Sequence, residues 1–169
     1  MQKRNKIILF IFLLFASLGV DRITKNLAKE HLMYQPTRYY LGDTFRLEYA
    51  ENTGAALSLG DDLPQPYSLI LLSIIPIIVM IGLTVYVFYN INKLNTILFI
   101  SLTLIIAGGV GNIIDRILYD RHVTDFMNMG IGSLRTGIFN VADMCVTGGV
   151  IGILLSSFKS EKPKTEQVT

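Results

Sequence analysis

LPQPYSLILLSIIPIIVMIGLTVYVFYNIN (residues 63–92), followed after Lys93 by LNTILFISLTLIIAGGVGNII (residues 94–114), is the part of the sequence that decides the fold. Neither stretch contains Lys, Arg, Asp, Glu or His. A transmembrane helix needs about 20 consecutive apolar residues to cross a hydrocarbon layer of about 30 Å. Each stretch is therefore long enough to span a membrane, and Lys93 marks the turn between the two spans.

Two further apolar stretches lie closer to the chain ends. Residues 7–20 are uncharged, and residues 138–158 carry a single charge, on Asp143. With a few flanking residues each can also span, which gives four transmembrane helices. We expect one polytopic membrane domain over residues 1–158, with spans at about 6–24, 67–90, 94–115 and 138–158, and a disordered cytoplasmic tail over residues 159–169.

The first stretch has an alternative interpretation as a cleaved signal peptide, because basic residues precede its apolar run. No A-x-A cleavage site follows that run. Instead, the amphipathic segment 21–29 continues the helical pattern, and Asp21 and Lys25 stand four residues apart in the order that stabilises a helix. We therefore expect the segment to be retained as the first span.

Composition excludes several classes of function. Of 169 residues, 51% are apolar and 17% are charged, whereas soluble domains average about 25% charged residues. The formal net charge is +2, and no long block of like charge could follow a phosphate backbone, so nucleic acid is not an expected partner. The chain has one cysteine and two histidines, so we expect no internal disulfide, no metal site and no cofactor.

The distribution of Lys and Arg orients the chain. Basic residues collect before the first span, at the turn between spans two and three, and in the tail: Lys3, Arg4, Lys6, Lys93, Lys159, Lys162 and Lys164. The positive-inside rule makes this side cytoplasmic and places both termini there. The loops at about 30–66 and 119–137 then face outward, and the alternating residues around Gly42-Asp43 predict a small β-hairpin in the first of them.

Small residues predict that spans three and four approach each other closely. Ala107 and Gly111 form a small-xxx-small pair, and Gly148 and Gly152 form a GxxxG pair. This approach concerns function because both spans carry acids.

A carboxylate within the hydrocarbon is a functional-site hypothesis by default, because inserting one costs about 2.5 kcal/mol or more. Asp143 is such a residue, and Asp115 and Asp125 are rival partners for it. Asn112 stands three residues before Asp115, and Asn140 stands three residues before Asp143, so each amide shares a helical face with an acid. Spacing alone leaves the partner of Asp143 open.

Two carboxylates held close together share a proton, so one can act as a base towards water while the other donates a proton to a carbonyl oxygen. That is the chemistry of aspartic peptidases. The alternative is a non-catalytic helical assembly subunit, in which the acids serve as interhelical polar clamps and Arg116 neutralises one of them. An intramembrane protease of the GxGD type is disfavoured, because Asn112 and not Asp follows Gly109-Val110-Gly111.

Five motifs together resemble lipoprotein signal peptidase, or signal peptidase II. They are Asp21-Arg22-Ile23-Thr24-Lys25, Glu51-Asn52-Thr53-Gly54-Ala55-Ala56, Gly111-Asn112-Ile113-Ile114-Asp115-Arg116, Val123-Thr124-Asp125-Phe126 and Phe139-Asn140-Val141-Ala142-Asp143. The resemblance implies a multi-pass aspartic peptidase of the bacterial inner membrane with its active site near the outer leaflet. Its substrates would be diacylglyceryl-modified prolipoproteins, cleaved on the amino side of the modified cysteine, and membrane lipid would be a further partner.

The resemblance also implies which residues carry the chemistry. Asp125 and Asp143 map onto the family's catalytic pair, and cyclic peptide inhibitors such as globomycin are expected to bind there. Supporting or substrate-binding roles would fall to Asn52, Gly54, Asn112, Asp115, Arg116, Asn140, Asp21 and Lys25.

Overall fold

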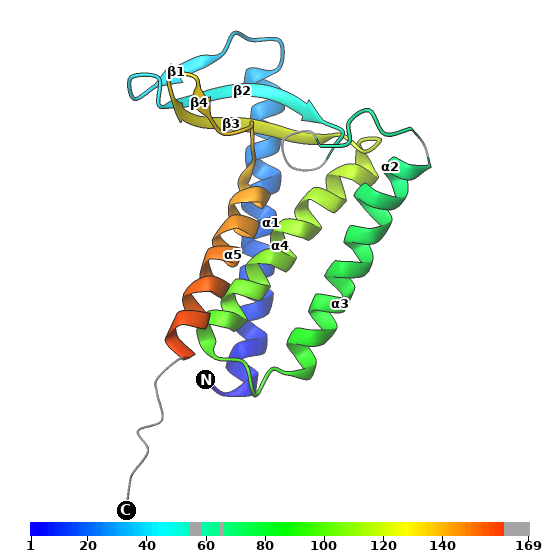
Figure 1. Cartoon of the computed structure of the whole chain (residues 1–169), viewed down its shortest axis with the longest axis vertical. Coiled ribbons are helices and arrows are strands. Elements are labelled where there is room, and N and C mark those ends of the chain that lie inside the picture. The colour runs from blue at the N-terminus through cyan, green and yellow to red at the C-terminus, as the bar shows by residue number, and fades with distance from the viewer. Residues whose placement is uncertain (55–58, 65, 161–169) are drawn as a thin grey trace, which may run out of the picture.

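The computed structural model describes residues 1–54, 59–64 and 66–160, which form a bundle of long helices with a small β-sheet across one end (Figure 1). The helices are α1 (Lys3–Leu32), α2 (Tyr67–Leu69), the π-helical segment η2 (Ile70–Ile74), α3 (Ile75–Tyr89), α4 (Thr96–Leu118) and α5 (Val141–Ser160). Because α2, η2 and α3 follow one another without a break, the described chain has 4 helical segments long and apolar enough to cross a membrane. The predicted fold class, four membrane helices with a small β-element, is confirmed.

Helix α1 is longer than the predicted span at 6–24. It continues through the amphipathic segment 21–29 and ends at Leu32, which confirms that this segment extends the first helix. The extension places the buried side chains of Asp21 and Lys25 against α4. Two predictions fall outside the described residues: the tail beyond residue 160, and Ala55-Ala56 of the second motif.

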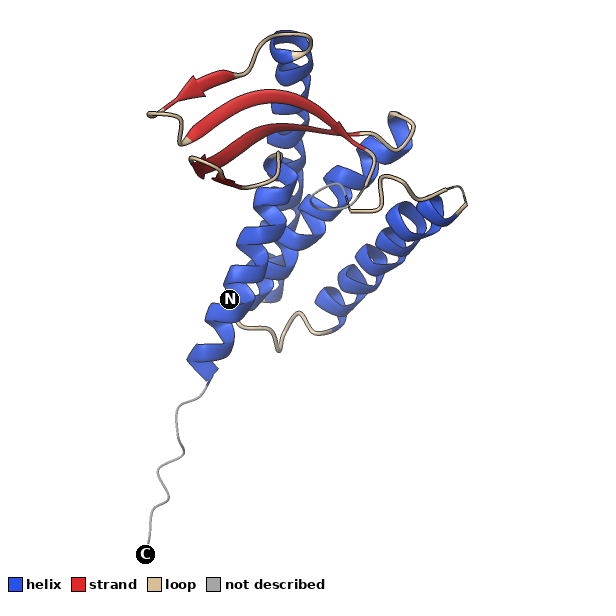
Figure 2. Cartoon of the chain, turned by 45° about the horizontal axis from the view of Figure 1, so that its top comes forward, coloured by secondary structure: helices blue, strands red, loops and turns tan. Residues whose placement is uncertain are grey.

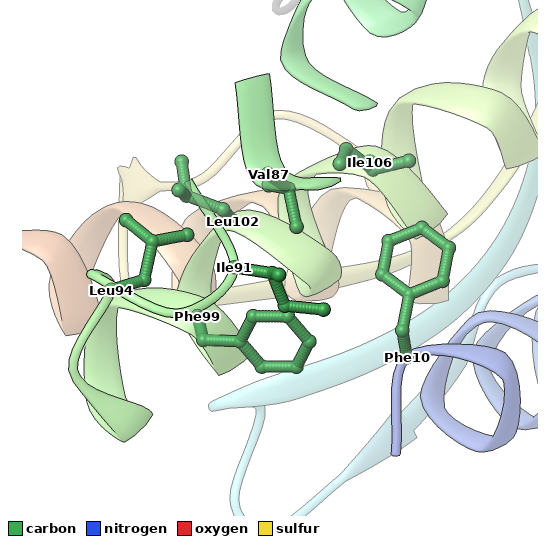
Figure 3. Close-up of a cluster of buried hydrophobic side chains, with 7 residues drawn as sticks. All are labelled: Phe10, Val87, Ile91, Leu94, Phe99, Leu102 and Ile106. Carbon is green, nitrogen blue, oxygen red and sulfur yellow. The ribbon is translucent and has the colours of Figure 1, made fainter. Parts of the chain in front are cut away.

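The bundle is apolar on its outside as well as in its core. Large apolar side chains are exposed on every long helix, among them Phe12, Ile78, Ile117 and Leu155, a pattern that suits a helix surrounded by lipid. Away from the sheet, buried side chains from α1, α3, α4 and the turn before α4 pack together (Figure 3): Phe10, Val87, Ile91, Leu94, Phe99, Leu102 and Ile106.

Helices α4 and α5 pack closely through glycines, as predicted, but with one difference. A Cβ at Gly108 or Gly111 would press on Ala142, and one at Gly149 or Gly152 would press on Ser101. Gly148 does not belong to this contact, because a Cβ there would meet no atom within 4 Å. The contact pair on α5 is therefore Gly149 and Gly152, one residue away from the predicted Gly148.

The sheet is antiparallel, with strands β1 (Arg38–Tyr40), β2 (Phe45–Asn52), β3 (Val123–Ile131) and β4 (Leu134–Arg135) in spatial order β1-β2-β3-β4 (Figure 2). The predicted hairpin around Gly42-Asp43 is confirmed as the β1–β2 connection. Positive φ angles at Leu41, Gly42 and Asp43 turn the chain, and the Arg46 guanidinium donates to both carboxylate oxygens of Asp43, at 2.6 and 2.8 Å.

The segment predicted as a plain loop at 119–137 contains β3 and β4. β3 pairs with β2 so that Ala50 lies opposite Asp125 and Asn52 lies opposite Val123. This pairing is the part of the fold that positions the site, because it brings Asn52 and Asp125 to the end of the sheet nearest the helices.

Candidate active site

Asn140 and Asp143 cap the start of α5 reciprocally. The Asp143 backbone N–H donates to the Asn140 side-chain oxygen at 3.0 Å, and the Asn140 backbone N–H donates to Asp143 Oδ2 at 3.0 Å. This is the capping-box arrangement with Asn and Asp in its two positions. A carboxylate in the first helical turn is also favoured by the helix dipole. The other oxygen of Asp143 accepts from Asn112 Nδ2 at 2.8 Å.

Asp125 lies on β3 and is 3% exposed. Its Oδ1 accepts from Asn140 Nδ2 at 2.6 Å, and its Oδ2 accepts from Asn52 Nδ2 at 3.1 Å. Burial, and next the negative charge of Asp143, raise the pKa of Asp125 to about 6, against the lowering effect of the two amides and of the Lys25 charge. Asp125 is therefore a carboxyl group that holds its proton far more readily than an ordinary aspartate.

The two carboxyl groups are joined through one residue. Asn140 donates its backbone N–H to Asp143 and its side-chain N–H to Asp125. Its side chain also donates to Asn112 Oδ1 at 3.2 Å. The arrangement holds two acids beside each other, each with hydrogen-bonded oxygens, and can support general acid–base chemistry.

Asp115, the rival partner left open by spacing, lies in a different environment. It is fully buried on α4, where Arg22 NH1 contacts its Oδ1 at 2.6 Å and Lys25 Nζ contacts its Oδ2 at 2.8 Å. Two cations from α1 therefore neutralise Asp115, which makes it a tie between α1 and α4.

Asp21 joins α1 to the start of α5. Its Oδ2 lies 2.8 Å from Lys25 Nζ, and its Oδ1 accepts from the Ala142 backbone N–H at 2.9 Å. The first turn of a helix has backbone N–H groups without intrahelical partners, and Asp21 satisfies one of them from another helix. Asp21 thus fixes the position of the turn that carries Asp143.

Gly54 and Arg116 meet at the edge of the same site. Arg116 NH2 donates to the Gly54 carbonyl at 2.7 Å, and the Gly54 N–H donates to Asn52 Oδ1 at 2.9 Å. Arg116 thereby links the strand that carries Asn52 to the C-terminal end of α4. Its buried Nε has no hydrogen-bond partner within the described residues.

A cavity of about 670 Å³ opens at the carboxylate pair. Polar groups gather around the two acids, and mostly apolar side chains of β3, of the segment before α5 and of α5 itself form the rest of the wall. The lining residues are Asn52, Asn112, Arg116, Val123, Asp125, Met129, Thr136, Gly137, Ile138, Phe139, Asp143, Met144, Val146, Thr147, Gly148 and Ile151. Within the described part of the chain, no three His, Cys, Asp or Glu side chains gather in a way that could hold a metal ion.

A family model described as signal peptidase (SPase) II matches residues 13–159 of this chain. This chain belongs to the signal peptidase II family. It is accordingly an aspartic peptidase of a membrane-enzyme family, and the interpretation as a non-catalytic assembly subunit is set aside.

Relatives and solved structures agree with the family over nearly the whole chain. The lipoprotein signal peptidase of Clostridium tetani is 36% identical over 154 residues, 89% of this chain and 93% of that protein. The Borrelia hermsii protein of the same name is 34% identical over 158 residues, 90% of this chain and 89% of its own length. A solved bacterial membrane enzyme superposes with a TM-score of 0.79 at 28% identity, covering 96% of both chains.

For this signal peptidase II family member, sequence reasoning did not find the part of the cavity wall that α5 provides. Met144, Thr147, Gly148 and Ile151 line the cavity and follow the i, i+3, i+4, i+7 spacing of one helical face. The sequence signal for this wall was a threonine and a glycine on one face of the helix, Thr147 and Gly148. The link from Lys25 Nζ to Asn112 Oδ1, at 3.0 Å, was also missed, because it joins residues 87 positions apart.

Proposed function

We propose that this chain removes the signal peptide from prolipoproteins whose cysteine carries a diacylglyceryl group, and that it cleaves on the amino side of that cysteine. The observation that carries the proposal is Asn140, whose backbone and side-chain N–H groups bind Asp143 and Asp125 at the polar end of the cavity. The substrate class rests on the relatives named lipoprotein signal peptidase.

Asp125 and Asp143 are the proposed catalytic pair. One carboxylate removes a proton from water, whose oxygen bonds to the scissile carbonyl carbon, while the other carboxyl donates its proton to the carbonyl oxygen. When the carbon–nitrogen bond breaks, the proton taken from water passes to the leaving nitrogen. The proton on the former carbonyl oxygen then returns to its carboxylate, so the pair ends as it began and no covalent intermediate forms.

The rest of the cavity suits a substrate that is part peptide and part lipid. Arg116 lines the same cavity as the two carboxylates, where its guanidinium can bind a peptide carbonyl oxygen. The apolar wall along α5 offers a surface for the diacylglyceryl chains or other membrane lipid. Cyclic peptide inhibitors such as globomycin would occupy the same cavity and contact the pair.

We propose that the protein is a multi-pass protein of the bacterial inner membrane with both termini cytoplasmic. The N-terminus, the turn at Lys93 and the end of α5 lie at one end of the bundle, and the sheet and the start of α5 lie at the other (Figure 1). The basic residues of the first end support a cytoplasmic location. The carboxylate pair would then stand near the outer leaflet, with residues 1–158 as the membrane domain.

The test is cleavage by detergent-purified protein of a diacylglyceryl-modified prolipoprotein and of its unmodified precursor. We expect release of the signal peptide from the modified substrate only. Cleavage of neither substrate would refute the proposed activity. Equal cleavage of both would remove the lipid from substrate recognition while leaving the peptidase activity in place.

A further inference from the structure

Lys25 is a buried cation to which the proposed mechanism gives no task. Its side chain is 1% exposed on α1. Its ammonium group contacts three oxygens: Asp21 Oδ2 at 2.8 Å, Asp115 Oδ2 at 2.8 Å and Asn112 Oδ1 at 3.0 Å. The contacts with Asp21 and Asp115 are ion pairs, and the contact with Asn112 is a hydrogen bond that Lys25 donates.

The contact with Asn112 differs from the two ion pairs because it reaches an amide that binds the carboxylate pair. Asn112 Oδ1 accepts from Lys25 Nζ and from Asn140 Nδ2, at 3.0 and 3.2 Å. Its Nδ2 donates to Asp143 Oδ1 at 2.8 Å. A flipped amide would set N–H groups against the donors of Lys25 and Asn140 and an oxygen against a carboxylate oxygen. Lys25 therefore helps to fix which end of the amide faces Asp143.

Charge balance separates this orienting role from simple neutralisation. Asp115 has a second cation, Arg22, at 2.6 Å, and the group Asp21, Arg22, Lys25 and Asp115 carries two charges of each sign. Arg22 contacts the same carboxylate as Lys25 but makes no hydrogen bond to Asn112 or Asn140 among the described residues. Lys25 is thus the member of this group that reaches the amides of the site.

We propose that Lys25 is a positioning residue for the catalytic pair, which it orients through the side-chain amide of Asn112. From Asn112 the orientation passes directly to Asp143, and through Asn140 to Asp125. The proposal rests on the proposed function, because positioning has a measurable effect only if the pair cleaves substrate. A purely structural tie between α1 and α4 would leave the chemistry of the pair unchanged.

The charge of Lys25 supplies a readout that a structural tie does not. The groups around Asp125 are Asp143 on α5, Asn140 just before α5, Asn52 on β2, Lys25 on α1 and Arg116 on α4. Lys25 lowers the pKa of Asp125. Removal of the Lys25 charge should therefore raise that pKa. The alkaline limb of kcat/KM, where the singly protonated pair loses its remaining proton, should then move to higher pH.

The experiment compares Lys25→Met with Arg22→Met in the full-length, detergent-purified protein acting on the diacylglyceryl-modified prolipoprotein. Both changes remove one positive charge and one partner of Asp115, but only Lys25→Met removes the contacts with Asn112 and Asp21. For each variant we would measure the melting temperature, kcat, KM and the pH profile of kcat/KM. Losing a hydrogen bond to a charged group is worth roughly a 10- to 100-fold change in rate.

We expect Lys25→Met to lower kcat by roughly 10- to 100-fold with KM little changed, and to move the alkaline limb upward. Arg22→Met should lower the melting temperature but leave kcat within about threefold and the alkaline limb in place. If Lys25→Met does not fold, the charge-balanced Lys25→Met/Asp115→Asn protein is compared with Asp115→Asn, and the same ratio of kcat values is expected.

Equal kcat values and unshifted limbs for Lys25→Met and Arg22→Met would overturn the positioning role while the peptidase activity stands. Absence of cleavage by the unsubstituted protein would overturn the proposed function and the positioning role with it.

Discussion

At the residue scale, Asn140 serves both the fold and the site with different atoms. Its side-chain oxygen caps α5 by accepting from Asp143 N–H, and its side-chain nitrogen donates to Asp125. A substitution that keeps the helix cap but removes the contact with Asp125 should therefore lower activity without lowering stability. Serine can cap a helix about as well as asparagine, but its single hydroxyl cannot also reach Asp125 as the amide does.

We expect Asn140→Ser to keep its melting temperature within a few degrees and to lose roughly 10- to 100-fold in kcat. Asn140→Ala should lose the same activity and, in addition, about 1 kcal/mol of stability from the missing cap. Thermal unfolding and initial cleavage rates on the two variants are the measurement. Full activity in Asn140→Ser would show that the contact with Asp125 is not needed.

The acid–base behaviour of the pair also belongs to the residue scale. Coupled acids titrate with two macroscopic constants, and the active form carries one proton. Because burial and Asp143 raise the pKa of Asp125 to about 6, the free enzyme should leave its singly protonated form near that pH. We expect a bell-shaped profile whose alkaline limb in kcat/KM lies near pH 6.

The corresponding limb in kcat should lie at higher pH, because bound substrate excludes water and further disfavours the second charge. Initial rates measured from pH 4 to pH 9, at low and at saturating substrate, test both statements. A flat profile across pH 5 to 8 would contradict the shared proton.

At the element scale, α5 presents adjacent glycines to different surroundings. Gly148 lies on the cavity wall, where an added Cβ would meet no atom within 4 Å, whereas Gly149 is buried against Ser101 and Ile105 of α4. Adding a side chain at the two positions should therefore have different effects. A side chain at Gly148 would reduce the volume of the cavity, whereas one at Gly149 would disrupt the contact between α4 and α5.

We expect Gly148→Leu to keep or slightly raise the melting temperature, since leucine favours helix by nearly 1 kcal/mol over glycine. It should raise KM because the side chain narrows the cavity. Gly149→Ala should lower the melting temperature, because its methyl group meets backbone of α4. The melting temperature and KM of the two variants test this prediction. An unchanged KM in Gly148→Leu would exclude this face of α5 from substrate binding.

The elements also show how far sequence reasoning could go. Four helices could be predicted because lipid requires long stretches without charge, and Asp143 stood out as an acid inside one of them. Strand β3 was missed because its pairing partner β2 lies some 70 residues earlier, and its buried residues do not alternate. Such pairing depends on tertiary packing that local pattern does not encode.

Sequence spacing could not decide whether Asp115 or Asp125 is the partner of Asp143, again because the answer depends on contacts between distant residues. What distinguishes them is which side chains of α1 face α4, namely Arg22 and Lys25, which contact Asp115. Residues 90 or more positions apart cannot be placed together by spacing. The resemblance to a family selected Asp125, and the geometry shows a physical reason to treat Asp115 as neutralised.

At the scale of the whole molecule, orientation in the membrane can be tested by labelling. Leu134, in β4, and Lys93, in the connection between α3 and α4, are both exposed. The sheet and this connection lie at opposite ends of the bundle (Figure 1). Replacing Cys145 by serine leaves no native thiol, and a single cysteine can then be placed at either position. A membrane-impermeant maleimide applied to intact cells, with the outer membrane opened where one exists, should label Leu134→Cys.

Lys93→Cys should react only after the inner membrane is permeabilised, as the positive-inside rule requires. Labelling of Lys93→Cys but not of Leu134→Cys in intact cells would invert the proposed topology.

The central claim is that Asp125 and Asp143 act as a catalytic pair and not as a structural clamp. The two roles make opposite predictions for stability. Because the pKa of Asp125 is raised in the fold, the folded state binds more protons than the unfolded state between about pH 4 and pH 6. Its ionisation therefore lowers stability as pH rises through that window, and the loss persists at neutral pH.

The most direct measurement is the cleavage rate at pH 5 and the melting temperature at pH 8 of Asp125→Asn, beside Asp115→Asn. An uncharged side chain at position 125 avoids the unfavourable ionisation, so Asp125→Asn should keep or raise the melting temperature while losing all measurable cleavage. Asp115→Asn should lower the melting temperature, because Arg22 and Lys25 lose a buried partner. An Asp125→Asn protein that remains folded and cleaves the diacylglyceryl-modified prolipoprotein at the unsubstituted rate would contradict the account.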